Sequence, residues 1–379
     1  MNKLASLINR ENSVVTGKIG LEILYIFKNF PVFFGCVDSD LENDLFVDMI
    51  WAIDRESGVI QLTKLIPLDI LYQEQHVDGC GPTWQQYYQD FANYLLQNKI
   101  DSWFEIGGGM GELAKIVTKL TPAHWTVIEP NPIIEQSDQI DVIKGFFDKN
   151  FKTNKKIEAL VFSQVMEHAY NPNEFLATAN KILEPGGKLI FAYPNLELWL
   201  KNKYTNALNF EHTMFLTDCF VDYLLIKNNF IITDKYFYKD HSIFYTAEKG
   251  VNALTTVELP NKYEEYRTIF TDFISYHQAM ITDLNEKIDK AGRPVYLFGA
   301  HIFSEYLLAF GLDKSKITSI LDNSPTKQGR RLYGTEFIVD SPRVLKGLGE
   351  VNVILKAGIY NEEIKKDILE NINPDVIFW

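Results

Sequence analysis

The chain has 379 residues, which is long for a single core and predicts two or three domains. Its hydrophobic content of 46% and charged content of 23% are ordinary for a soluble globular protein. The formal net charge of -13 argues against a surface for nucleic acid or an anionic membrane, and we expect neither as a partner. Cys36, Cys80 and Cys219 show no CxxC spacing, so they indicate a reducing cytoplasm and no disulfide framework.

Residues 1–85 are expected to form a small irregular module of short strands and turns, with one strand over 59–62. The apolar stretch 21–37 contains Glu22 and Pro31, so we do not expect it to span a membrane. The first residues also lack the long apolar region of a secretory signal.

From Trp84 to Leu95, aromatic and apolar residues recur at helical spacing and lead to a strand at 103–104. The sequence EIGGGMGE follows at 105–112 and opens a helical pattern. Its glycines are not spaced as in the GxGxxG of dinucleotide sites. The acid-x-Gly-x-Gly-x-Gly spacing instead resembles motif I of S-adenosylmethionine-dependent methyltransferases, where glycines let the backbone turn tightly against the ligand.

A second acid supports this resemblance. The strand over 125–128 ends at Glu129, about 20 residues beyond the glycines, where a carboxylate can hold both ribose hydroxyls. Residues 159–168 and 183–195 resemble the later strands of class I methyltransferases. The resemblance implies an α/β, Rossmann-like core over 86–249 that binds S-adenosylmethionine. The residues it assigns to the cofactor are Glu105, Gly107, Gly109, Gly111, Glu129, Phe146, Phe147, Ser163 and Gln164.

Residues 260–291 form a charge-rich amphipathic pattern that predicts a long bridging helix. A new alternation then begins, with predicted strands and helices over 294–298, 302–310, 317–321, 351–355, 361–372 and 376–378. Alternating strands and helices of these lengths predict a second Rossmann-like α/β domain, so that 250–379 comprise the bridging helix and a substrate-binding domain.

With these parts placed, the whole chain resembles the three-domain sugar C-methyltransferases of deoxysugar pathways, which act on nucleotide-linked ketosugars. The N-terminal module of that family binds zinc through two Cys pairs, the second in a CxxCGxxQL motif. Residues 54–62 keep the Gly, Gln and Leu of this motif but place Asp54 and Ser57 where the cysteines would stand. The first pair falls at Ser13 and Thr16. Because these are not zinc ligands of this kind, we expect no metal in the module.

The active-site segment of the family contains Tyr-His-Glu-His. The run NFEHTMFLT matches it at Glu211 and His212, whereas Asn209 and Phe210 replace the first Tyr and His. The resemblance implies that Glu211 and His212 are catalytic, with His212 as a general base because imidazole titrates near neutrality. The alternative is a structural histidine. We interpret His168, in a Met-Glu-His run, as shaping the turn after its strand, and a second catalytic base is the alternative.

In the C-terminal domain, Gly299 at a helix start and Asp322 at a strand end form a pattern like half of a dinucleotide site. A purely structural cap is the alternative. We expect residues 299–304 and 327–331 to hold the substrate's diphosphate and nucleotide, because Lys327, Arg330 and Arg331 form a basic cluster. The expected substrate-binding residues are His76, Gly299, His301, Asp322 and Lys327.

These patterns predict a methyltransferase that uses S-adenosylmethionine and acts on a nucleotide-linked ketosugar, by C-methylation through an enolate. O-methylation of a sugar or another small metabolite is the alternative. Because the zinc and active-site motifs are incomplete, a non-catalytic binding or scaffold protein with the same fold is the alternative of another class. We expect a cytoplasmic monomer or homodimer.

Overall fold

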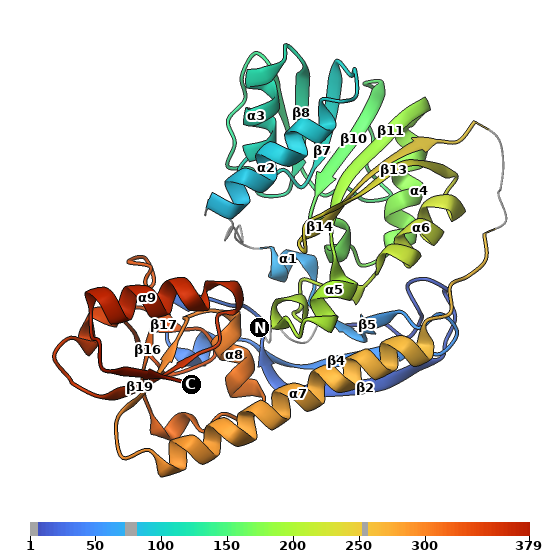
Figure 1. Ribbon diagram of the computed structural model, residues 1–379. Helices are drawn as coiled ribbons and strands as arrows, with labels where there is room; N and C mark the ends of the chain where they lie inside the picture. The colour runs from blue at the N-terminus through green and yellow to red at the C-terminus, as the bar shows by residue number, and fades with distance from the viewer. Residues whose placement is uncertain (1–6, 73–81, 252–256) are drawn as a thin grey trace.

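The computed structural model describes residues 7–72, 82–251 and 257–379. Figure 1 shows three parts: an N-terminal sheet, a central domain and a C-terminal domain, with the long helix α7 running along the first and the last. Two of the residues discussed above, His76 and Cys80, lie outside the described residues.

The N-terminal part is built on a four-stranded antiparallel sheet in the order β12-β5-β4-β2. Its main strands are β2 (Leu21–Pro31), β4 (Phe46–Asp54) and β5 (Ile60–Leu62). With 11 and 9 residues, β2 and β4 are longer than the short strands expected. The smaller elements are β1 (Ile8–Asn9), β3 (Cys36–Val37), η2 (Leu41–Asn43), β6 (Lys64–Leu65) and α1 (Leu68–Leu71).

The central domain contains a seven-stranded sheet in the order β13-β14-β11-β10-β7-β8-β9. The strands from β11 to β9 are parallel, and β14 is antiparallel to both of its neighbours. The strands are β7 (Ser102–Ile106), β8 (His124–Glu129), β9 (Ile140–Lys144), β10 (Ile157–Ser163), β11 (Leu183–Pro194), β13 (Phe230–Tyr238) and β14 (Ser242–Lys249).

Helices cover both faces of this sheet, with α2 and α3 on one side and α4 and α6 on the other (Figure 1). Along β10, Ala159 and Val161 join one apolar cluster while Leu160 and Phe162 join the other, because neighbours on a strand point to opposite faces. The helices are α2 (Pro82–Leu95), α3 (Glu112–Leu120), η3 (Met166–His168), α4 (Pro172–Ile182), α5 (Leu196–Lys201), η4 (Thr205–Ala207) and α6 (Asp218–Lys227).

The C-terminal domain contains a five-stranded parallel sheet in the order β18-β16-β15-β19-β20. Its strands are β15 (Val295–Phe298), β16 (Ile317–Leu321), β18 (Val339–Asp340), β19 (Val351–Leu355) and β20 (Val376–Phe378). The helices are α7 (Tyr263–Lys290), α8 (Ile302–Ala309), η5 (Lys314–Lys316), η6 (Pro342–Leu345), η7 (Gly358–Tyr360) and α9 (Asn361–Asn371). The expected fold class, with two Rossmann-like α/β units, is therefore confirmed.

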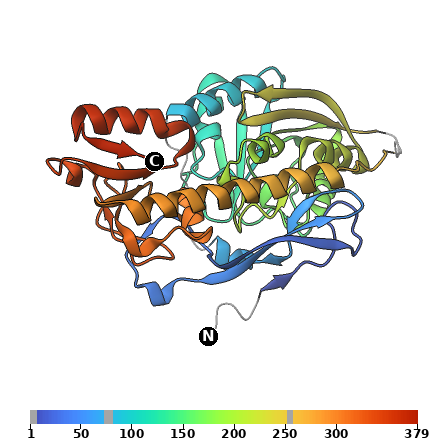
Figure 2. The same cartoon turned by 60° about the horizontal axis from the view of Figure 1, so that its bottom comes forward.

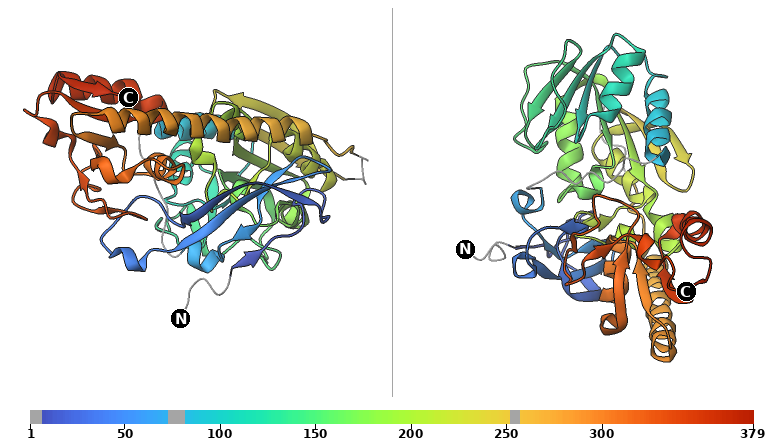
Figure 3. Two further views of the ribbon diagram at one scale, coloured as in Figure 1. Left: turned by 90° about the horizontal axis from the view of Figure 1, so that it is seen from below. Right: turned by 90° about the vertical axis from the view of Figure 1, so that its left-hand side faces the viewer.

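The three parts are interlocked by strand pairs. The central domain supplies β12 (Met214–Phe215), which pairs with β5, and the C-terminal domain supplies β17 (Arg331–Leu332), which pairs with β3. Figures 2 and 3 show α7 lying alongside the N-terminal sheet. None of the helices in the described part of the chain combines the length and the apolar character needed to cross a bilayer.

Candidate functional site

The glycine loop between β7 and α3 is packed at two glycines and open at a third. Gly107, Gly109 and Gly111 have φ angles of 69°, 53° and 74°, in the left-handed region that favours glycine. A Cβ on Gly107 would lie 2.8 Å from Val165 Cγ2, and one on Gly111 would lie 2.0 Å from Ile134 Cδ1. A Cβ on Gly109 would meet no described atom within 4 Å. Gly109 therefore borders space that a ligand can fill.

Glu129 closes this loop from the end of the neighbouring strand. Its Oε2 accepts a hydrogen bond from the Gly109 amide at 3.1 Å, and its Oε1 accepts one from the Asn131 amide at 3.1 Å. The carboxylate stands at the carboxyl end of β8, where ligands bind in open α/β sheets. The position fits a carboxylate that receives ribose hydroxyls.

Glu105 lies beneath the loop and away from its open side. The Trp125 indole donates a hydrogen bond to Glu105 Oε2 at 2.7 Å, and the residue is 3% exposed. Burial raises the pKa of Glu105 to about 7. A Cβ on Gly108 would lie 3.0 Å from Glu105 Oε2, so the carboxylate supports the turn from below. A direct contact between Glu105 and the cofactor stays a prediction.

The two phenylalanines assigned to the cofactor differ in their surroundings. Phe146 follows β9 and is 44% exposed. The ring of Phe147 packs against Phe151 and Phe175, with ring centroids 5.3 Å apart in both pairs. Phe146 is therefore the better placed of the two to contact a ligand.

Ser163 and Gln164 stand at the carboxyl end of β10 in a polar network. The Tyr87 hydroxyl lies 2.7 Å from Ser163 Oγ, and Gln164 Nε2 donates hydrogen bonds to Tyr87 and to Ser242 Oγ. His241 Nδ1 lies 2.6 Å from the same Ser242 oxygen. Gln164 has a φ of 56°, a conformation that non-glycine residues adopt rarely and that occurs often at functional sites. The sequence did not indicate Tyr87 as part of this edge.

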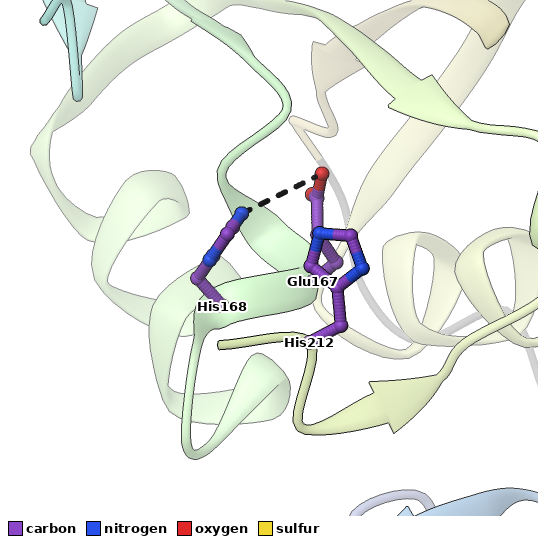
Figure 4. Close-up of side chains that lie close together, drawn as sticks. All are labelled: Glu167, His168 and His212. Carbon is purple, nitrogen blue, oxygen red and sulfur yellow. Dashed lines mark ion pairs between the residues drawn. The ribbon is translucent and has the colours of Figure 1, made fainter. Parts of the chain in front are cut away.

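Glu167, His168 and His212 come together beside the glycine loop. One potential ligand atom from each residue lies within 4.8 Å of the others, and the two imidazole ring centroids are 4.9 Å apart. Figure 4 shows both rings turned toward the Glu167 carboxylate. Glu167 and His168 belong to η3, directly after β10, whereas His212 comes from the segment between η4 and β12. His168 was expected to shape a turn, with the role of a second base as the alternative, and the fold brings it next to the expected base.

Glu167 is fully buried, and within the described residues neither of its carboxylate oxygens has a hydrogen-bond partner. Burial raises the pKa of Glu167 to about 8. Burial lowers the pKa of His212 to about 4, and the nearby Ala207 carbonyl only partly opposes this. Desolvation disfavours the charged form of both groups, so both are mainly neutral at pH 7. The expectation that His212 titrates near neutrality is therefore wrong, because the fold buries its ring.

Glu211 faces His168 instead of its neighbour His212. Glu211 Oε2 lies 3.9 Å from His168 Nδ1, and the Tyr72 hydroxyl lies 3.0 Å from the same nitrogen. Asn209 Oδ1 accepts a hydrogen bond from the His212 amide at 2.6 Å. Asn209, at a position where the resembled family differs, therefore holds the turn that presents His212.

The N-terminal part holds both histidine-bearing segments. Arg10 donates hydrogen bonds to the backbone carbonyls of Tyr170 and Thr213, at 2.9 Å and 3.1 Å, and each carbonyl lies just beyond one of the histidines. The Tyr72 carbonyl accepts a hydrogen bond from the Asn131 side chain. Tyr72 thus connects the segment after Glu129 with the histidine cluster.

The four positions at which the resembled family has cysteines do meet in space. Asp54 Oδ2 accepts hydrogen bonds from the hydroxyls of Ser57, Ser13 and Thr16, at 2.6, 2.9 and 3.3 Å. Ser13, Asp54 and Ser57 are buried. A carboxylate and three hydroxyls occupy the place of four thiolates, and this set does not fit a structural zinc ion.

Four predicted substrate residues gather at the carboxyl ends of β15 and β16. Asp322 Oδ2 accepts a hydrogen bond from the Ala300 amide at 2.9 Å and lies 3.4 Å from Lys327 Nζ. Gly299 has a φ of 107°, and its Cβ position is open. His301 stands at the N-cap position of α8.

Arg331 was expected in a basic cluster with Lys327 and Arg330, but its side chain is buried elsewhere. Its guanidinium is bidentate to Asp44, at 2.7 Å and 2.8 Å, and donates to the Ser39 carbonyl. Arg330 pairs with Asp38, but this pair is exposed, so Arg330 stays in the predicted cluster with Lys327. The assignment of Arg331 to the diphosphate is wrong because its partner lies 287 residues away, where no local pattern reveals it.

Comparisons with known proteins agree with these observations. Residues 82–232 match the family described as a methyltransferase domain, and residues 237–371 match the family described as a C-methyltransferase C-terminal domain. No curated protein matches the chain as a relative.

Solved structures similar to part of the chain include several methyltransferases. The N-methyltransferase NodS from Bradyrhizobium japonicum, in complex with S-adenosylhomocysteine, is 13% identical with a TM-score of 0.36, covering 47% of this chain and 95% of that chain. A methyltransferase from Mesorhizobium loti is 9% identical with a TM-score of 0.38, covering 43% and 99%. The plantazolicin methyltransferase BpumL is 14% identical with a TM-score of 0.36, covering 44% and 83%.

The match over the central domain accounts for the glycine loop and the acid that closes it, and the second match accounts for most of the remaining chain. The chain therefore contains a methyltransferase domain followed by a C-methyltransferase C-terminal domain, and it is an S-adenosylmethionine-dependent methyltransferase.

Proposed function

We propose that the protein methylates a carbon atom of a nucleotide-linked ketosugar. The observation that carries this proposal is the pair of imidazoles beside the glycine loop, in a chain that ends in a C-methyltransferase C-terminal domain. Bound S-adenosylmethionine supplies the methyl group and a good leaving group. The protein must hold the acceptor carbon in line with that methyl and remove a proton from it.

His212 is the proposed base. Its ring is neutral at pH 7, which is the form that accepts a proton from the carbon next to a ketone. Tyr72 and His168 lie within one hydrogen bond of each other, and a hydroxyl and an imidazole are suitable donors to the developing enolate oxygen. Glu211 then orients His168, so its proposed role is to position another residue.

The cofactor would be held by the open side of the glycine loop at Gly109 and by Glu129, with Phe146, Ser163 and Gln164 along the same edge of the sheet. The nucleotide end of the acceptor would be held by Gly299, His301, Asp322 and Lys327. Phe210, next to the base, packs near Phe30, whose ring lies 5.0 Å from that of Tyr306 in α8. This packing joins the segment that carries the base to the C-terminal domain.

We also propose that the N-terminal part folds without zinc, because Asp54 and its hydroxyl partners occupy the metal position. Elemental analysis of protein purified without added metal tests this, and one equivalent of zinc at these four positions would contradict it.

The acceptor is tested by incubating the protein with S-adenosylmethionine and dTDP-, GDP-, CDP- or UDP-linked ketosugars, with products located by mass spectrometry and NMR. Incubation of the accepted ketosugar in D2O is the sharper test, because a base that forms an enolate exchanges the α proton for deuterium. Methyl on oxygen, without exchange, would show an O-methyltransferase. Cofactor binding with no product on any acceptor would favour a scaffold.

His212→Ala should lower turnover by about 10²- to 10⁴-fold, the usual contribution of a general base. His124→Ala is the matched control, because His124 is a partly exposed histidine at the start of β8. Unchanged turnover in His212→Ala would show that another group removes the proton.

A further inference from the structure

We propose that Glu167, His168 and His212 bind a divalent cation beside the glycine loop. The three side chains converge from two segments of the chain, and a potential ligand atom of each lies within 4.8 Å of the others (Figure 4). Bonds from a divalent cation to imidazole nitrogen and carboxylate oxygen are about 2.0–2.2 Å long. Small rotations of the side chains would therefore bring all three onto one ion.

The buried carboxylate is the second observation that indicates a cation. Glu167 is 0% exposed, and among the described residues no other residue forms a hydrogen bond with either of its oxygens. A buried polar group without a partner is costly, and such groups are rare in folded proteins. His168 Nε2 lies 3.9 Å from Glu167 Oε1. This distance is too long for a hydrogen bond, but one ion between the two atoms can bind both.

The surroundings of His168 are those of a metal-bound histidine. Metal-ligating histidines bind the ion with one ring nitrogen and contact a hydroxyl, carbonyl or carboxylate with the other. Here the Tyr72 hydroxyl lies 3.0 Å from Nδ1 and the Glu211 carboxylate lies 3.9 Å from it. These contacts turn Nε2 toward Glu167. Tyr72 and Glu211 would therefore be outer-shell residues of the ion.

The donor set defines the class of cation. Two imidazoles and one carboxylate favour Mn²⁺, Fe²⁺, Co²⁺ or Zn²⁺ over Ca²⁺, which prefers six to eight oxygen ligands. Three protein ligands leave open positions on the ion. The side chain of His168 is 21% exposed, so one side of the site is accessible to solvent or to an acceptor.

This inference deepens the proposed function and rests on it in one respect: the open positions of the ion would take an oxygen of the acceptor. With the ion bound, His212 is a ligand and not the base, and a hydroxide held at another open position would take the α proton and become water. A cation there would hold the ketone oxygen and stabilise negative charge that develops on it. The ion position lies next to the cofactor loop, because Val165, two residues before Glu167, contacts the Cβ position of Gly107. Binding of the ion itself does not depend on any acceptor.

The experiment uses Mn²⁺ as the probe, since thiols such as Cys36 and Cys219 compete poorly for it. The full chain, freed of metal with a chelator, is titrated with Mn²⁺ and the free ion is counted by electron paramagnetic resonance. We expect one bound ion and a rise in Tm on binding. Glu167→Gln removes the negative ligand but keeps the shape, and it should weaken binding at least tenfold and abolish the rise in Tm.

His212→Gln is the second ligand variant and should weaken binding similarly, so a folding defect in one variant leaves the other as a test. The control is His124→Gln with Asp141→Asn, an exposed histidine-carboxylate pair 3.0 Å apart that offers only two ligands. Absence of Mn²⁺ binding, or equal affinity in the wild type and Glu167→Gln, would overturn the site. Because neither cofactor nor acceptor is present, failure here leaves the proposed acceptor untouched, and failure of the acceptor screen leaves the metal result untouched.

Discussion

The hydroxyl of Tyr72 lies 3.0 Å from Nδ1 of His168, so a residue of the N-terminal part fixes a ring in the central domain. This contact gives the first prediction. Tyr72→Phe keeps the ring but removes the hydroxyl, and turnover should fall on the order of tenfold, as is usual for partners that orient an active-site histidine. Cofactor affinity, measured by calorimetry, should stay the same. Equal turnover in both proteins would show that Tyr72 only packs.

The glycine loop predicts two different outcomes for two similar changes. In Gly109→Leu the side chain enters the open space of the loop, so we expect cofactor binding by calorimetry to fall at least tenfold with a modest loss of stability. In Gly111→Leu the side chain meets Ile134, and we expect the larger loss of stability, as overpacking costs about 1–3 kcal/mol. Both variants share the strain of positive φ, so each is the control for the other. Retained cofactor affinity in Gly109→Leu would place the cofactor elsewhere.

Glu105 gives a pH dependence of stability. Its pKa rises from 4.5 to about 7 on folding, because burial disfavours the carboxylate. Between these values the native state holds a proton that the unfolded state has lost, so the contribution of Glu105 to stability falls as pH rises. Glu105→Gln removes this dependence, and relative to wild type the variant should gain up to about 3 kcal/mol between pH 4.5 and 7. Parallel unfolding curves across this range would contradict the assignment.

The polar cluster at Asp54 predicts a loss of stability in one variant and a gain of zinc binding in another. Asp54→Asn leaves one acceptor oxygen for several donors, and the free energy of unfolding should drop by about 1–3 kcal/mol. The quadruple change Ser13→Cys, Thr16→Cys, Asp54→Cys and Ser57→Cys should create a tetrahedral thiolate site that binds one zinc ion, since the four positions already converge. Elemental analysis measures this against the wild type, and a quadruple variant that folds without zinc would show the geometry to be unsuitable.

Variants at Arg331 and Lys327 should distinguish a residue needed for stability from a residue needed to bind the nucleotide. Arg331→Ala leaves Asp44 buried without its partner, and breaking such a pair typically costs about 3–5 kcal/mol. Arg330→Ala, which breaks a more exposed pair with Asp38, should cost less than about 1 kcal/mol. Lys327→Ala should leave the unfolding curve unchanged but weaken binding of the nucleotide diphosphate. Stable Arg331→Ala protein with lost nucleotide binding would restore the role that the sequence suggested.

The elements of both α/β units follow from local patterns. The strand, glycine turn and helix around Gly107 are dictated by apolar alternation and by positive φ, and all lie within one short window. The same holds for Asp322, which ends β16 as expected. Such features depend on neighbours in the chain, so a single sequence reveals them.

Long-range contacts could not be predicted in this way. The meeting of His168 with His212, and of Arg331 with Asp44, joins segments whose separation depends on how the sheets pack. Glu167 looked ordinary in sequence, because its burial depends on the segment that carries His212. The meeting of Asp54 with its three hydroxyl partners follows from no local pattern, and only the resemblance to a family with cysteines at these positions indicates it.

The strand pairs β12-β5 and β17-β3 also constrain the order in which the chain can fold during synthesis. The sheet that begins at residue 21 receives its last strand only after residue 215 has left the ribosome, and β3 receives its partner only after residue 332. The N-terminal part therefore lacks two short strand partners until these segments have been made. A cut between the central and C-terminal domains should yield two fragments that need each other to become stable, and not two independent proteins.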